Sequence, residues 1–387
     1  MNKGSFYIES NPSRIKTFIN FYEVELEENK IKLHILSTLS PKYPKDYLKK
    51  INNGILINAG FTYNVDFKAE KSPIDFTYNL HIENNCLLNL PTYTKTAIIE
   101  KDGKIEPRKI KASGCLYFGN IKILWIGSHE KQAFSDKKMS VVYGISNQGL
   151  IKSDLGIIPN KKQEWIKLSK GYKNIIIDIA FLKKDRILYI KKITNQKTKL
   201  FDGIFILQTP NEMVKKLKVG LRITDWIVDG LSPKNTDFAV TSGIQIPKSI
   251  KKLYQNIMTE KIVITRRADD NNPYYSNIEQ QKARSCIFKT GNLIHFLLID
   301  ARPRIIGQQG ISIPDLANYI YRKNHNVKWA INCDGGQSSK ICLKQKGKLR
   351  VFGNLHYLNL KKLKPEWNGE NGRPITSCVI AFPKNKY

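Results

Sequence analysis

Residues 327–339 read Val327-Lys328-Trp329-Ala330-Ile331-Asn332-Cys333-Asp334-Gly335-Gly336-Gln337-Ser338-Ser339 and join a buried strand to a turn. The apolar first half predicts the strand. Positions i and i+2 share one side of a strand, so the amide of Asn332 and the carboxylate of Asp334 project together. Such a polar end to a buried strand is unusual, and it marks this point of the chain as a candidate site.

The turn that follows is rich in glycine and serine. Gly335 and Gly336 let the backbone approach a ligand closely or adopt a positive φ. Ser338 and Ser339 add hydroxyls and amide N–H groups of the kind that hold phosphate oxygens. The residues therefore indicate either a phosphate-binding turn or a tight turn with a structural aspartate, and they leave both open.

A second strongly apolar strand, residues 293–300, ends in the same manner. Asp300 and Arg302 again stand at positions i and i+2, and Arg284 precedes the strand. The planar guanidinium fork of arginine matches phosphate oxygens. Two arginines and two carboxylates at strand ends suggest a site for a phosphorylated substrate, although each alone would be an ordinary surface ion pair.

Strand patterns dominate the rest of the chain. Turn signals separate short apolar runs, with a hairpin about Asp102-Gly103 and further strands expected at residues 55–58, 121–126, 175–181, 187–190, 204–207 and 341–343. Helices are expected at residues 44–51 and 211–217, and after the capping residue Ser312. The pattern predicts an α+β fold of mixed, strand-rich sheets with a few helices. With no Pro-, Gly- or Ser-rich linker, we expect a short N-terminal element at 1–50 and one domain at 51–387.

Composition supports a folded and strongly basic chain. The 387 residues are 41% hydrophobic and 10% aromatic, which excludes a wholly disordered chain. Lys and Arg number 64 against 33 Asp and Glu, which gives a net charge of +31. Residues 159–200 are the most basic block, with twelve Lys or Arg and three acidic residues. The excess reflects either a coding bias that places lysine on solvated sheet faces, or attraction to a polyanion or anionic substrate.

The sequence shows no targeting or membrane signal. The N-terminal residues lack an apolar h-region, and no apolar run reaches the roughly 18 residues of a membrane span. The six cysteines are scattered, with no CxxC pair and no zinc spacing. We therefore expect a soluble cytoplasmic protein with reduced thiols and no membrane span, while the oligomeric state stays open.

Four motifs follow one another along the chain: Arg284-Ser285-Cys286, Asp300-Ala301-Arg302, residues 310–316, and residues 332–339. Their order resembles the phosphodiester glycosidase family, whose pattern is Arg-Thr-Ala, Asp-Gly-Arg, Gly-x-Thr-x-x-Glu-Leu and Asn-Leu-Asp-Gly-Gly-Gly-Ser-Ser. That is the family of the enzyme that uncovers mannose 6-phosphate by removing N-acetylglucosamine. Three further segments are similar to the family's Asn-Gly-Gly-Phe segment, small-residue turn and closing strand, namely residues 58–61, Ser242-Gly243 and residues 372–375. The resemblance covers residues 51–383 and is strongest over 283–340.

The resemblance implies hydrolysis at the anomeric carbon of an anionic sugar 1-phosphodiester. It assigns Asp334 first, and Asp300 second, to activating water or attacking the sugar. It assigns phosphate binding to Arg284 and Arg302 together with the turn residues Gly335, Gly336, Ser338 and Ser339. Asn332, Asn58 and Ser338 would orient the sugar beside the Ser242-Gly243 turn.

This chain departs from the family pattern at several positions. Gln337 and Ala301 stand where the family has glycine, and Cys286 and Phe288 stand where it has alanine and glycine. These changes leave the charged groups in place, but they narrow the pocket or change what it accepts.

Two other functions stay open. The chain could be a non-catalytic nucleic-acid- or nucleotide-binding protein on the same fold, or an enzyme acting on a nucleotide-linked glycosyl phosphate. Stacking on nucleobases would need exposed aromatics, for which Trp165, Tyr172 and Tyr189 are candidates that could equally be core. No cofactor is required by the pattern, although Asp269-Asp270 could hold a divalent cation. His81 and His295 lie among apolar strand residues, which favours packing over catalysis.

Overall fold

The computed structural model describes residues 1–10, 15–60, 79–128, 130, 139–144, 150–153, 156–159, 165–182, 185–199, 202–260, 281–301, 310–353, 356–359, 364–367 and 375–384. These residues form twenty-eight β-strands, four α-helices and one short 3-10 helix. The α+β class expected from the sequence is therefore wrong, because the described part of the chain is nearly all β.

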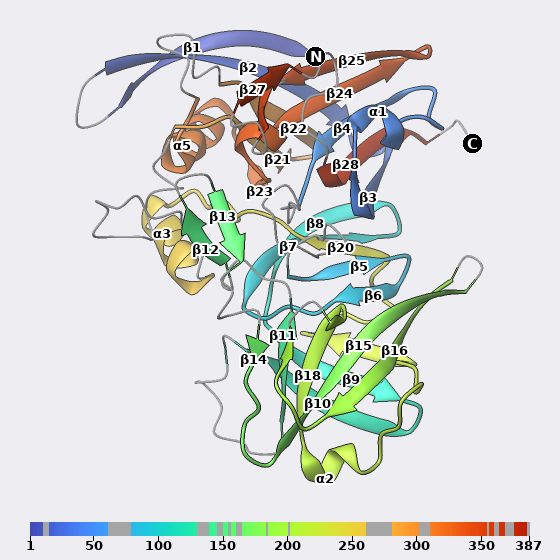
Figure 1. Ribbon diagram of the computed structural model, residues 1–387. Coiled ribbons are helices and arrows are strands. Elements are labelled where there is room, and N and C mark those ends of the chain that lie inside the picture. Colours follow the sequence, from blue (N-terminus) through green and yellow to red (C-terminus); the bar gives the residue numbers. More distant parts are fainter. Residues whose placement is uncertain are drawn as a thin grey trace.

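Two antiparallel five-stranded sheets build the upper half of the molecule (Figure 1). The first sheet runs β1 (Asn2–Ser10), β2 (Ile15–Glu27), β22 (Leu293–Ile299), β21 (Arg284–Thr290), β23 (Val327–Asn332). The second sheet runs β25 (Lys348–Gly353), β24 (Lys340–Gln345), β4 (Gly54–Asn58), β28 (Ile375–Pro383), β3 (Ile31–Lys42). Both sheets bury apolar residues in one shared core, which includes Ile57, Phe296 and Val379.

Two more sheets build the middle and the lower half (Figure 1). The third sheet runs β6 (Cys86–Asn89), β5 (His81–Glu83), β20 (Phe238–Thr241), β7 (Lys95–Lys101), β8 (Lys104–Ile110). The fourth runs β16 (Asp185–Thr194), β15 (Tyr172–Leu182), β18 (Phe205–Pro210), β11 (Ser140–Gly144), β10 (Ile121–Gly127), β9 (Ser113–Phe118), β19 (Asp225–Val228). They enclose a second core, in which Trp125 and Phe205 are completely buried.

Three two-stranded ribbons complete the described strands. They pair β12 (Leu150–Ser153) with β13 (Gly156–Pro159), β14 (Trp165–Ile166) with β17 (Thr198–Lys199), and β26 (His356–Asn359) with β27 (Lys364–Trp367).

Two helices, of 10 and 11 residues, cover one face of the first sheet. They are α3 (Ile250–Thr259) and α5 (Ile313–Lys323), and both contribute to a third core with β21 and β22. Ser312 caps α5 as expected, because its hydroxyl accepts the N–H of Asp315 at 3.1 Å. No helix in the described ranges is long and apolar enough to cross a membrane.

The sequence overestimated the helical content at two places. The helices expected at residues 44–51 and 211–217 are single turns, α1 (Pro44–Tyr47) and α2 (Asn211–Val214). A single turn leaves most of its backbone groups without helical partners, so it cannot form an independent layer of the fold.

The first fifty residues hydrogen-bond to strands from the other end of the chain. β2 pairs with β22, and β3 pairs with β28. The domain boundary placed at residue 50 stays a prediction, but the strands before it belong to the two upper sheets.

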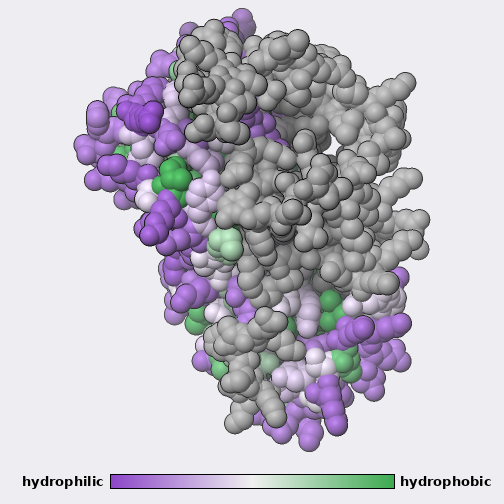
Figure 2. Space-filling model, turned by 90° about the vertical axis from the view of Figure 1, so that its left-hand side faces the viewer, coloured by the Kyte–Doolittle hydropathy of each residue, from purple (hydrophilic) through white to green (hydrophobic). Residues whose placement is uncertain are grey.

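The surface fits the composition. Figure 2 shows one side of the molecule, on which the described residues are mostly hydrophilic and hydrophobic residues form only small, separated spots. A mostly hydrophilic surface of this kind is what a chain with 25% charged residues should have.

His81 makes the stability of this fold dependent on pH. The ring is completely buried in β5, and burial together with the charge of Arg186 lowers its pKa to about 3. In the unfolded chain the ring has its ordinary pKa of about 6.5, so the unfolded state binds more protons between these values. We predict that stability falls as the pH drops below about 6.5, by about 2 kcal/mol at pH ~5.

Denaturant unfolding at several pH values measures this dependence. His81→Gln removes the titrating ring, so its unfolding free energy should lose this part of the acid slope. An identical slope in the variant and the parent would contradict the prediction.

Candidate functional site

Three strand ends meet at one edge of the first sheet. Arg284 begins β21 and pairs with Ile299, the last residue of β22, while Cys286 pairs with Asn332, the last residue of β23. The antiparallel register therefore places Arg284, Asp300 and Asp334 at the same edge, although the sequence separates them by up to fifty residues.

Backbone hydrogen bonds fix the loop of residues 333–339 against this edge. The N–H of Cys333 donates to the carbonyl of Ser285 at 2.8 Å, and the N–H of Gly336 donates to that of Ala283 at 2.8 Å. The N–H of Asp334 donates to the carbonyl of Ala59 at 3.0 Å, just beyond the end of β4. The loop is thus held by both upper sheets, which fixes the backbone on either side of the Asp334 carboxylate.

The side chain of Asn58 joins the same elements. Its Oδ1 accepts from the hydroxyl of Ser285 at 2.6 Å and from the N–H of Lys340 at 3.1 Å. Its Nδ2 donates to the carbonyl of Asp334 at 2.7 Å. The family resemblance implies that Asn58 orients a sugar, which stays a prediction; in the structure its amide joins β4 to β21 and to both ends of the loop.

Arg284 is a buried cation beside the loop. Its side chain is 5% exposed, and its Nε donates to the carbonyl of Ile311 at 3.2 Å. Burial lowers the pKa of Arg284 to about 10, while the neighbouring Asp334 carboxylate acts to raise it. The guanidinium therefore stays charged at neutral pH, in a setting of low dielectric where its charge acts strongly on nearby groups.

Gly310 makes the Ile311 contact possible. It has φ +86°, and a Cβ there would lie 2.3 Å from the backbone of Lys282. Because glycine allows this approach, Ile311 forms a bridge with Lys282 next to Arg284. The 310–316 motif seen in the sequence thus positions both the helix cap and the arginine.

Gly243 packs against Asn332 at the site, and the neighbouring Ser242 contacts Ala59. A Cβ at Gly243 would lie 2.0 Å from the carbonyl oxygen of Asn332, so only glycine fits there. The hydroxyl of Ser242 donates to the carbonyl of Ala59 at 3.1 Å. These contacts give Ser242 and Gly243 a role in backbone packing.

Two buried polar atoms at the site have no hydrogen-bond partner among the described residues. They are Oδ1 of Asn332 and Oγ of Ser339. Buried polar groups are rarely left without a partner, because each such group costs free energy. A polar ligand or an ordered water at the loop would satisfy them. Ser338, also predicted for this site, is 1% exposed in the same loop.

Asp300 lies at this edge in a different setting. Its Oδ1 accepts the N–H of Ala301 at 2.9 Å, and its own N–H donates to Asn20. Since Arg284 pairs with Ile299, strand alternation turns the next side chain toward the opposite face of the sheet. The described part of the chain does not include Arg302, Asp269, Asp270 or the side chain of Gln337. What was expected of these residues therefore stays a prediction.

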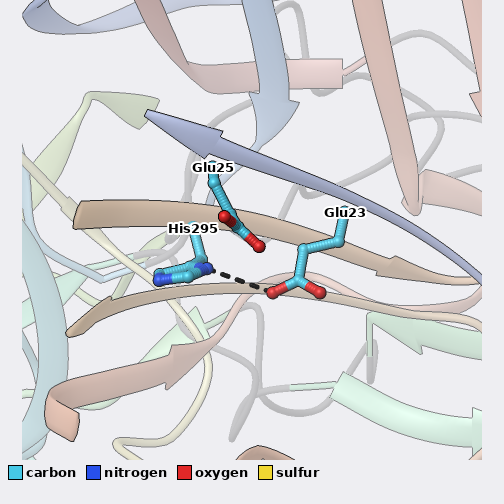
Figure 3. A group of neighbouring side chains, drawn as sticks. All are labelled: Glu23, Glu25 and His295. Atoms are coloured by element: carbon cyan, nitrogen blue, oxygen red, sulfur yellow. Dashed lines mark hydrogen bonds and ion pairs between the residues drawn. The ribbon is translucent and has the colours of Figure 1, made fainter. Parts of the chain in front are cut away.

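A separate carboxylate and histidine group lies on the first sheet (Figure 3). Glu23, Glu25 and His295 are close enough to hold a metal ion, but the buried members already have partners. His295 Nδ1 lies 3.1 Å from Glu23 Oε1, and the ammonium of Lys323 bonds to Glu23 Oε2. Burial would raise the pKa of Glu23, but the hydrogen bonds from His295 and Lys323 lower it overall. Lys323 thus supplies the positive charge that a metal ion would bring.

Comparisons with known proteins give the fold only. No protein-family model and no curated protein matches the chain. A hypothetical protein from Synechocystis matches 99% of this chain at 13% identity with a TM-score of 0.50, and this chain spans 62% of its length. A protein of Burkholderia pseudomallei, described as a candidate exported protein, matches 97% of this chain and 76% of its own length at 12% identity, TM-score 0.55.

The catalytic domain of zebrafish N-acetylglucosamine-1-phosphodiester alpha-N-acetylglucosaminidase, auto-inhibited by its pro-peptide, is a more distant neighbour. It covers 98% of this chain and 81% of its own length at 12% identity, with a TM-score of 0.42. The first two likenesses concern the fold alone, and the third is below the level that supports a shared fold. The cytoplasmic location stays a prediction.

The Asn58 contacts give a stability prediction. Asn58→Ala leaves the carbonyl of Asp334, the hydroxyl of Ser285 and the N–H of Lys340 without their partner. We expect a loss of about 2–4 kcal/mol in the free energy of unfolding, since each buried group left unsatisfied costs about 1–3 kcal/mol and the effects are not additive. Chemical denaturation measures it, with the exposed Asn195→Ala change as a control. A loss of unfolding free energy no larger than that of the control variant would show that the Asn58 hydrogen bonds do not stabilise the fold.

Proposed function

We propose that the chain hydrolyses a glycosyl phosphodiester at the anomeric carbon of an anionic sugar-phosphate substrate. The observation that carries the proposal is the buried Arg284 beside Asp334 of the glycine- and serine-rich loop, together with two unpartnered polar atoms, Oδ1 of Asn332 and Oγ of Ser339. The ordered motifs that resemble the phosphodiester glycosidase family support the same chemistry.

The leaving group explains why an arginine suits this reaction. Breaking the bond between the anomeric carbon and oxygen moves its electron pair onto a phosphate oxygen. A phosphate monoester is a weak base, so it needs charge stabilisation more than protonation. In the proposed mechanism Arg284 supplies that charge, and its burial makes the interaction stronger than it would be in water.

A carboxylate then serves the sugar side. Asp334 accepts a proton from water as the water oxygen bonds to the anomeric carbon, or it attacks that carbon itself before water releases it. Asp334 is preferred to Asp300 because the charge of its carboxylate acts on the buried guanidinium of Arg284. Asn332 and Ser339 would bind sugar hydroxyls through their unpartnered atoms.

A second function, binding of nucleic acid, has one specific observation in its favour. Trp165 is 37% exposed, and the ammonium groups of Lys197 and Lys199 lie 4.9 and 5.3 Å from its ring centre. An accessible aromatic ring among cations is the arrangement that single-stranded nucleic acid uses. Titration with single-stranded DNA at increasing salt separates the two functions, since phosphate neutralisation gives an affinity that falls steeply with salt.

The mechanism predicts the effect of removing one negative charge. Asp334→Asn keeps the size of the side chain and both hydrogen bonds of the residue's backbone, so the fold should persist. Because Arg284 loses part of its charge compensation, denaturation of the variant checks that it is folded. We expect turnover of a methyl phosphodiester of α-N-acetylglucosamine 1-phosphate to fall by at least about 100-fold, as general-base or nucleophile loss requires. Sugar release measures it.

Asp300→Asn is the matched comparison, with a smaller loss expected. Wild-type turnover in Asp334→Asn would overturn the assignment. Failure of the parent protein to release sugar from any glycosyl phosphodiester would overturn the proposed function.

A further inference from the structure

A basic hairpin leads directly away from the candidate site. β24 starts at Lys340, the residue after the loop, and returns as β25 through the turn Lys346-Gly347. Leu343 pairs with Arg350, and Gln345 pairs with Lys348. At about 3.3 Å per residue, these pairs stand roughly 10 and 17 Å along the strand from Lys340.

One face of this hairpin carries a hollow of about 330 Å³. Within the described part of the chain it is lined by Leu343, Gln345, Lys346, Lys348 and Arg350, which we call the hairpin groove. The three cations are exposed, and no acidic or aromatic side chain stands among these lining residues. The other face of the hairpin packs its apolar residues Cys342, Leu349 and Val351 on the core of the second sheet.

Lys346 is an unusual residue at the tip. Its φ is +48° and that of Gly347 is +79°, as in the two-residue turns that favour Asn or Gly at both central positions. Lysine pays a steric cost there, since its Cβ disfavours positive φ. The turn itself does not require a lysine, but an anion-binding groove would gain a third cation from it.

We propose that the hairpin groove binds successive phosphates of a linear poly(glycosyl phosphate), so that the chain acts on polymers whose cleaved end lies at Asp334. The inference rests on the proposed function for its substrate class. Charge complementarity carries it, because Arg350, Lys348 and Lys346 form a row of exposed cations along the hairpin, starting about 10 Å along the strand from Lys340, and such a row matches successive phosphates of a polymer. The absence of aromatic residues among the described lining residues favours sugar phosphates over single-stranded nucleic acid, which stacks its bases on aromatic rings.

The test compares two triple variants with equal loss of charge. Lys346→Asn, Lys348→Gln and Arg350→Gln empty the groove of cations, and asparagine suits the left-handed turn, so the hairpin should persist. Lys215→Gln, Lys216→Gln and Lys218→Gln remove three exposed lysines at and beyond α2, at the opposite end of the molecule (Figure 1). The substrates are a short oligomer of N-acetylglucosamine 1-phosphate units in diester linkage and the corresponding single-repeat diester.

The groove variant should raise KM for the oligomer by about 10-fold or more and leave the single-repeat diester unchanged, while the α2 variant changes neither. In the parent protein, the logarithm of the binding constant for the oligomer should fall linearly with the logarithm of the salt concentration. In the groove variant the magnitude of this slope should be smaller by about 2–3, since each phosphate contact releases about one counterion. Equal behaviour of the two variants would overturn the proposal. So would single-stranded DNA binding to the groove as tightly as the oligomer.

The two proposals fail in distinguishable ways. If the parent protein cleaves neither substrate but binds the oligomer through the groove cations, the proposed hydrolysis is wrong and the groove stands. If it cleaves the single-repeat diester and treats oligomer and diester alike in every variant, the hydrolysis stands and the groove is wrong.

Discussion

The amide of Asn58 is the contact on which the rest of the site depends. It lies at the end of β4 in the second sheet, and its hydrogen bonds reach β21 of the first sheet and both sides of the 333–339 loop. Two sheets that share a hydrophobic core can still slide relative to each other, because apolar contact has no direction. The directional bond from Ser285 to Asn58 joins the two sheets, and the bonds of Asn58 to Asp334 and Lys340 hold the two ends of the loop.

The electrostatics of the site follow from that placement. A buried guanidinium is costly unless an anion compensates it, and Asp334 supplies part of that compensation. A bound phosphate would bring a second anion to Arg284 and would repel the carboxylate. Arg284 therefore suits the phosphate side of a substrate, and Asp334 suits the sugar side, where positive charge develops at the anomeric carbon. In the proposed mode of binding, the net charge acts through its local arrangement in the hairpin groove more than through its total.

Some of this could be predicted from the sequence alone. The two apolar strands and the helix cap follow from local patterns. In the structure Asp300 and Asp334 lie just beyond the ends of β22 and β23, and Ser312 caps α5. The contacts between the two upper sheets could not be predicted, because they join residues that are more than two hundred positions apart, such as Asn58 and Ser285. Without these contacts, Asn58 was assigned to binding the sugar. The hydrogen bond between the Asp300 carboxylate and the N–H of Ala301 could not be foreseen either. The α+β class failed because two of the expected helices are single turns. In addition, residues 1–50, expected only as a short N-terminal element, contain three long strands of the upper sheets.

The position of bond cleavage distinguishes attack at the anomeric carbon from attack at phosphorus. Hydrolysis of a glycosyl phosphodiester in water enriched in heavy oxygen places the label on whichever atom the water attacks. Attack at the anomeric carbon, with Arg284 stabilising the departing phosphate, predicts label in the released sugar and none in the phosphate. Label in the phosphate would contradict the account, because water would then have attacked phosphorus.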